Sequence, residues 1–284
     1  MWEFRVNLAN GVKESKYPVW TRANNYKSSD AKGVEYNELM RANGGTSLDY
    51  IGLDPYLSDL DGLYAYGHKT ISTSGTQVNA WGKNLVMAME NGGDITNAPN
   101  AVLATLAGGA LYNTYEIYGP DGYGLYVPTS DSDFTPVARG SYVADVKVVN
   151  NMLKKIGHDL ASRVPLSVGG TGIAFYNYLA SDTTSTSNFQ AFNVTYETTN
   201  TTGVGISTVR TGTELAFVSS QDATFTLSSA SAYNVVSAET GSYNGGTTWS
   251  KDETATYNSK DGDVDFSIAA GECIRIVFEE TVAT

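Results

Sequence analysis

Residues 84–93 have the sequence NLVMAMENGG, in which a short apolar run is followed by Glu90 and the turn signal Asn91-Gly92-Gly93. Three other runs have the same form, at residues 17–22, 49–53 and 111–115, and polar residues follow each of them. Nearly continuous apolar strands, each followed by a helix or a long loop, are typical of parallel βα units that are buried on both faces. The first 164 residues are therefore predicted to form a parallel α/β region.

The spacing of these four strands fits both a doubly wound sheet and a (β/α)8 barrel. Helices are expected between and after them, over residues 31–42, 97–107 and 141–160. No Gly-x-Gly-x-x-Gly motif joins a strand to its helix, which argues against dinucleotide binding. Polar residues at the strand ends favour the barrel, because active sites of such barrels lie at the C-terminal rim of the strands.

Only four βα units are visible, whereas a closed barrel of this type has eight. Residues 1–15 carry Phe4, Leu8 and Val12 at helical spacing, as at the end of a helix that belongs to a preceding unit. The sequence therefore predicts that the chain begins in the middle of a barrel, with its four strands as strands five to eight.

The pattern changes near residue 165. Short segments with alternating apolar residues follow, separated by turn signals such as Asn244-Gly245-Gly246 and Asp261-Gly262. This pattern is typical of an antiparallel β-sandwich. The predicted fold class is α/β plus all-β: a partial (β/α)8 barrel of about four βα units over residues 1–164, followed by an antiparallel β-sandwich domain over residues 165–284.

Composition excludes several classes of partner. The chain has 18 basic and 30 acidic residues, a net charge of −12, and no cluster of basic residues, so nucleic-acid binding is not expected. Cys273 is the single cysteine, which excludes an internal disulfide framework. No apolar run reaches the length of a membrane span. Residues 261–272 have part of the spacing of a calcium loop, but Phe266 stands where glycine is needed, so no metal is predicted.

Glu90 is the strongest candidate for chemistry. A carboxylate at the end of a strand, beside a glycine turn that allows close approach, can attack an anomeric carbon when a second carboxylic acid lies about 5–5.5 Å away. The alternative is that Glu90 caps the next helix or faces solvent. Asp54 and Glu116 occupy matching positions after their own strands, where they can bind sugar hydroxyls, orient Glu90, or serve only to hold the loops.

The segments 51–56 (IGLDPY) and 85–93 (LVMAMENGG) resemble clan A glycoside hydrolases, in particular the β-galactosidase-like families. The resemblance implies a (β/α)8 barrel with an acid/base glutamate after strand four, a nucleophile after strand seven, and commonly a C-terminal β-sandwich. Glu90 matches the nucleophile, and Tyr56 matches the tyrosine that often contacts it. The Asn-Glu pair that supplies the acid/base has no counterpart in this chain.

The resemblance implies the C-terminal part of a retaining glycoside hydrolase that acts on O-glycosidic bonds of an oligo- or polysaccharide, without a cofactor. Such enzymes belong to bacterial polysaccharide degradation, outside the cell or in the periplasm. The isolated chain is expected to be inactive and to form a homodimer through its half-barrel. Besides the catalytic Glu90, the residues expected to line the sugar site are Asn24, Asn25, Asp54, Tyr56 and Glu116.

The alternative function is that of a non-catalytic carbohydrate-binding or surface protein, in which the sandwich does the binding. Aromatic residues aligned on one exposed face of the sandwich would favour this alternative. A cluster of polar residues around Glu90 would favour the enzyme.

Overall fold

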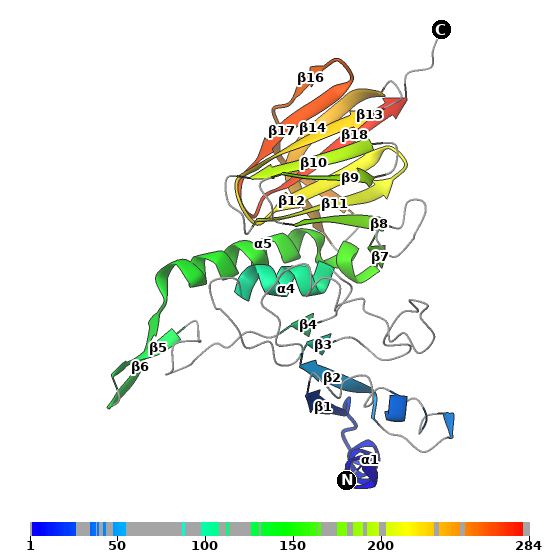
Figure 1. The fold of residues 1–284 in the computed structure, drawn as a ribbon, viewed down its shortest axis with the longest axis vertical. Helices are drawn as coiled ribbons and strands as arrows, with labels where there is room; N and C mark the ends of the chain where they lie inside the picture. Colours follow the sequence, from blue (N-terminus) through cyan, green and yellow to red (C-terminus); the bar gives the residue numbers. More distant parts are fainter. Residues whose placement is uncertain are drawn as a thin grey trace.

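The structure is a computed structural model, and it describes residues 2–26, 35–37, 39, 42–43, 48–54, 87–88, 98–107, 112–113, 126–130, 132–162, 164–165, 175–180, 184–189, 192–198, 203–229, 233–244 and 248–280. A parallel sheet lies toward the N-terminus, two helices lie in the middle, and two larger sheets lie toward the C-terminus (Figure 1). The described residues include the helices α1 (Trp2–Lys13), α4 (Ala98–Ala107) and α5 (Gly140–Ser162). They correspond to the helices predicted over residues 1–15, 97–107 and 141–160.

The N-terminal sheet is parallel and its strands follow the order of the sequence. It consists of β1 (Arg22–Tyr26), β2 (Tyr50–Asp54), β3 (Met87–Ala88) and β4 (Tyr112–Asn113), in the order β1-β2-β3-β4. Each neighbouring pair is parallel. Parallel neighbours need a long crossover between them, and helices commonly supply it. The strands predicted over residues 49–53, 84–89 and 111–115 are found in β2, β3 and β4.

The strand predicted over residues 17–22 is wrong. The side chains of Tyr17, Val19 and Trp20 are between 59% and 75% exposed, and β1 begins only at Arg22. Pro18 has no N–H to donate to a ladder and restricts the residue before it, so an apolar run around it does not make a strand.

Asn24 and Asn25 lie within β1, and not in the loop after it as predicted. They pair with Gly52 and Leu53 of β2. Asparagine is uncommon in strands because its intrinsic strand propensity is low. Pairing with a buried neighbouring strand outweighs this low propensity. The neighbour is buried here, since Ile51 of β2 is fully enclosed.

The C-terminal part forms two packed sheets. The larger has the order β15-β14-β18-β12-β11-β8-β7 and the smaller has the order β16-β17-β13-β10-β9. All neighbours are antiparallel except β7 and β8. The strands are β7 (Val164–Pro165), β8 (Phe175–Ala180), β9 (Thr184–Phe189), β10 (Phe192–Thr198), β11 (Val204–Thr211), β12 (Glu214–Ser219), β13 (Ala223–Ser229), β14 (Tyr233–Asn244), β15 (Thr248–Thr254), β16 (Asn258–Lys260), β17 (Asp263–Ile268) and β18 (Cys273–Glu280). Residues 255–257 form the connection from β15 in one sheet to β16 in the other.

The space between the two sheets is filled by apolar side chains that alternate along the strands. Phe217 of β12, Phe225 of β13 and Phe266 of β17 form its aromatic centre. Their ring centroids lie 4.9–5.6 Å apart, which is the separation of favourable aromatic pairs. This alternation is the pattern that predicted a sandwich from the sequence.

The outer face of the seven-stranded sheet is covered by α4 and α5 (Figure 1). Leu103 of α4 and Met152 and Ile156 of α5 pack in one apolar cluster with Ile206 of β11 and Val218 of β12. The apolar side of α5 thus supports the sandwich. Within the described part of the chain, no helix is long and apolar enough to cross a membrane.

A charged network lies on the same outer face of the large sheet. Arg275 of β18 places Nε 3.0 Å from Oε1 of Glu214 and donates from Nη2 to Oε2 of Glu214 at 3.1 Å. Its Nη1 donates to Glu239 at 3.4 Å, and the indole of Trp249 donates to the same carboxylate oxygen at 2.9 Å. The hydroxyl of Tyr243 donates to Glu214 at 2.9 Å. The guanidinium therefore joins three strands, because it extends from β18 and its two carboxylate partners belong to β12 and β14.

The hairpin that precedes α5 was not predicted from the sequence. It consists of β5 (Tyr126–Ser130) and β6 (Asp133–Ala138), and it projects away from the rest of the molecule (Figure 1). Every residue of β6 is exposed, including the apolar Phe134 and Val137. Two prolines that face each other, Pro128 and Pro136, weaken the strand pattern in the sequence.

Candidate functional site

The ends of the four parallel strands define the candidate site. Tyr26 at the end of β1 pairs with Asp54 at the end of β2. In the next ladders Leu53 pairs with Ala88, and Ala88 pairs with Asn113. Because the strands are parallel, their carboxyl ends lie along one edge of the sheet. Asp54 therefore ends its strand at the same edge where β3 and β4 end.

Three of the predicted site residues lie on described strands, and three do not. Asp54 is the last residue of β2, while Asn24 and Asn25 are inside β1, two residues and one residue before its end, respectively. Their backbones are brought together, since β1 and β2 are neighbours. The other predicted residues are outside the described part of the chain: Tyr56, Glu90 and Glu116.

A groove lies beside the outer edge of β1. Its volume is about 410 Å³, and it runs between α1 and this strand. Within the described residues β1 is the end strand of the sheet, so the groove borders an open strand edge. Leu8 and Val12 of α1 line it together with Trp20, and Asn24 contributes from β1. Asn24 therefore lies half-buried in a largely apolar groove.

The opposite end of the sheet is held by a charged clamp that the sequence did not reveal. Asp49, which precedes β2, accepts a hydrogen bond from Lys13 of α1 at 2.6 Å and one from the backbone N–H of Thr21 at 2.7 Å. Partial burial would raise the pKa of Asp49, but the Lys13 ammonium and the Thr21 donors lower it below its ordinary value. The clamp fixes α1 against β1 and β2 at their N-terminal ends, away from the candidate site.

No aromatic row is present on an exposed face of the sandwich among the side chains that the structure describes. The large apolar side chains that are exposed there are Val236 and Tyr257. The observation that would favour a stacking platform for polysaccharide is therefore missing from this part of the chain.

The sequence matches no protein-family model and no curated protein. Solved structures with a similar arrangement include a glycoside hydrolase family 30 subfamily 8 xylanase from Clostridium acetobutylicum, with 10% identity and a TM-score of 0.40 over 98% of this chain and 59% of that chain. A family 44 endoglucanase from Clostridium thermocellum has 13% identity and a TM-score of 0.36, over 97% of this chain and 60% of that chain.

A family 44 xyloglucanase from Paenibacillus polymyxa has 11% identity and a TM-score of 0.33, over 98% of this chain and 60% of that chain. These neighbours are glycoside hydrolases, and this chain spans about 60% of the length of each.

Proposed function

We propose that this chain is the C-terminal part of a retaining glycoside hydrolase that acts on O-glycosidic bonds, with Glu90 as its nucleophile. The observation that supports the proposal most is the order β1-β2-β3-β4 of the parallel sheet. Four consecutive βα units of a barrel produce this order. A doubly wound sheet reverses its strand order at a switch point, and its halves supply at most about three strands in sequence order.

The register of β2 and β3 also supports a sugar site at the edge where the parallel strands end. Glu90 follows Ala88 of β3 by two residues, a distance that extended chain spans in at most about 7 Å. Ala88 pairs with Leu53, the residue before Asp54. In this proposal the Glu90 carboxylate attacks the anomeric carbon and forms a glycosyl-enzyme ester while the aglycone oxygen leaves. Asp54 binds the sugar hydroxyls at the neighbouring strand end, with Asn24, Asn25, Tyr56 and Glu116 completing the site.

The proposal assigns no acid/base residue to this chain. Protonation of the leaving oxygen by a positioned acid contributes typically 10²–10⁴-fold to the rate. A substrate whose leaving group departs without a proton does not need this acid. Its reaction therefore tests the nucleophile alone.

We expect an activated 2-deoxy-2-fluoro glycoside with a dinitrophenolate leaving group to label the isolated chain at Glu90. The fluorine slows both steps, and the good leaving group departs as an anion, so the ester accumulates. Intact-mass measurement should show the added glycosyl mass, and peptide mapping should locate it at Glu90. Unactivated alkyl glycosides should show no turnover.

The matched variants are Glu90→Gln and Glu280→Gln, which remove one carboxylate each; Glu280 is exposed at the end of β18, on the sandwich. Glu90→Gln should abolish labelling, and Glu280→Gln should keep it. Labelling at another carboxylate, or none at any concentration of the glycoside for a folded chain, would contradict the nucleophile assignment. Rapid turnover of unactivated glycosides would show that an acid within this chain acts on the substrate.

We also propose that two copies associate through the surface formed by α1 and the outer edge of β1. Phe4, Leu8 and Val12 recur every four residues on α1, and all three are exposed, as is Trp20 beside them. Helical spacing places the first three on one face. Apolar patches of this kind mark association sites, and an open strand edge invites pairing.

We expect light scattering after size-exclusion chromatography to give the mass of a dimer for the wild-type chain. Leu8→Glu places a charge in the patch and should weaken the dimer by at least about tenfold. Val137→Glu is the matched control, because Val137 is an exposed apolar residue on the separate β5–β6 hairpin. A wild-type monomer at high concentration, or an equal effect of both variants, would refute the proposed interface.

A further inference from the structure

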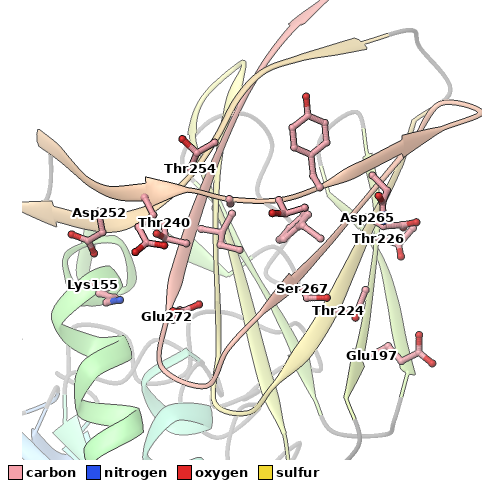
Figure 2. Close-up of a pocket in the computed structure, with 17 residues that line it drawn as sticks. Lys155, Glu197, Thr224, Thr226, Thr240, Asp252, Thr254, Asp265, Ser267 and Glu272 are labelled. Carbon is pink, nitrogen blue, oxygen red and sulfur yellow. The ribbon is translucent and has the colours of Figure 1, made fainter.

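A polar cleft lies on the sandwich, at a distance in the fold from the strand-end site (Figure 2). Its volume is about 810 Å³. It extends beneath the segment that crosses from β15 to β16, from Lys155 of α5 and Glu272 at one end to Glu197 of β10 at the other (Figure 2). This size lies within the range of cavities that bind small molecules.

The wall of the cleft is a grid of polar side chains on the outer face of the five-stranded sheet. In the ladder of β13 and β17, Thr224 pairs with Ser267, and Thr226 pairs with Asp265. These side chains face away from the core, because the residue between the two threonines, Phe225, is fully buried. Directly opposed side chains in an antiparallel pair lie about 4.5–5.5 Å apart. The grid therefore presents closely spaced hydrogen-bonding groups.

These groups have no bonding partner in the described part of the chain. Among the residues that the structure describes, no hydrogen bond or ion pair engages the side chains of Thr224, Thr226, Asp265 or Ser267. Hydroxyl groups both donate and accept, and a carboxylate accepts at two oxygens. A ligand rich in hydroxyl groups satisfies both kinds of partner, and its bonds to a carboxylate are the stronger, charge-assisted kind.

The charge of the cleft further restricts the class of ligand that it can bind. One ammonium, Lys155, faces five carboxylates in the lining, those of Glu197, Asp252, Glu253, Asp265 and Glu272. This excess of negative charge, on a chain of net charge −12, repels phosphates and uronates. The carboxylates are spread along the cleft, and no group of three His, Cys, Asp or Glu in the described residues is arranged to hold a metal ion.

We infer that this cleft binds a neutral carbohydrate chain, through the hydroxyl and carboxylate grid of β13 and β17. Tyr257, on the segment that crosses the cleft, is 37% exposed and gives the less polar face of a sugar ring a contact surface. Binding here is independent of Glu90, because the cleft is built wholly from the sandwich and α5. It differs from a stacking platform, which needs an exposed aromatic row.

The test is titration calorimetry of the full chain with cellohexaose and with xylohexaose, with trigalacturonate as the anionic probe and calcium chloride as the cation. At least one neutral hexasaccharide should bind, and trigalacturonate should bind at least about tenfold more weakly. Asp265→Asn should weaken binding of the neutral hexasaccharide about tenfold, since it removes a charged acceptor. Thr226→Val, which removes a hydroxyl at nearly constant shape, should weaken it by a similar factor.

Asp263→Asn is the matched control. Asp263 lies on the same strand and the same face, two residues from Asp265, but does not line the cleft. Its variant should bind within about twofold of wild type, and all three variants should keep the wild-type melting temperature. The inference is overturned if neither hexasaccharide binds, if the three variants behave alike, or if only calcium binds. None of these outcomes changes the labelling of Glu90.

Discussion

Replacement of Phe217 by alanine is expected to lower the free energy of unfolding by about 4 kcal/mol, as found for large-to-small changes in well-packed cores. The Phe217 ring is fully buried between the two sheets, with centroids of Phe225 and Phe266 at 5.1 and 4.9 Å. Strands on both sides prevent the cavity from collapsing. Urea denaturation followed by circular dichroism measures the change.

Val236→Ala is the matched control, because this residue of β14 is 58% exposed. Its effect should stay within about 0.5 kcal/mol, the range of ordinary surface substitutions. A loss of less than about 1.5 kcal/mol for Phe217→Ala would mean that the two sheets do not pack as tightly as the ring contacts indicate.

Arg275→Met is expected to cost about 3 kcal/mol, because it leaves Glu214 and Glu239 without their shared cation on a partly buried face. Lys251→Met removes the other cation near Glu239, but Lys251 is 45% exposed at 3.3 Å from it, so its loss should cost less than about 1 kcal/mol. Equal costs for the two variants would contradict the central role of Arg275.

The same network predicts a dependence on pH. Burial alone would raise the pKa of Glu214, but hydrogen bonds from Arg275 and Tyr243 and the charge of Arg275 lower it below the ordinary value of 4.5. A carboxyl group whose pKa is lower in the folded than in the unfolded chain stabilises the fold at pH values above its unfolded pKa. This contribution is lost as the pH falls through the folded pKa. Wild type should therefore lose stability as pH falls below about 4.5, and Arg275→Met should lose much less over the same range.

The sequence predicted the fold best where burial dictates the pattern. Alternating apolar residues gave the sandwich, because one face of each strand packs in the core, as with Phe225 and Leu227 of β13. It failed at β1, where an apolar run interrupted by Pro18 is exposed and the strand is made by Asn24 and Asn25. The residues of β2 that pair with this strand lie about 28 positions further along the sequence. A local sequence pattern therefore cannot indicate the pairing.

The candidate site was predictable only as an edge of the sheet. Asp54 follows an apolar run in the sequence, and the structure places it at the end of β2, where β3 and β4 also end. The clamp between Lys13 and Asp49 and the grid on β13 and β17 join residues that are 36 to 43 positions apart, so only the folded chain brings them together. The placement of Glu90 relative to Asp54 stays a prediction.

The cover that α4 and α5 give to the seven-stranded sheet bears on how this protein can be dissected. A fragment starting at residue 165 would retain both sheets but would expose Ile206, Val218 and Cys273 to water, because their partners Leu103, Met152 and Ile156 would be missing. Such a fragment should aggregate or precipitate on expression, whereas one that starts ahead of α4 keeps the sheet covered. The sandwich is therefore not a transferable module, and grafting it onto another enzyme would require both helices to travel with it.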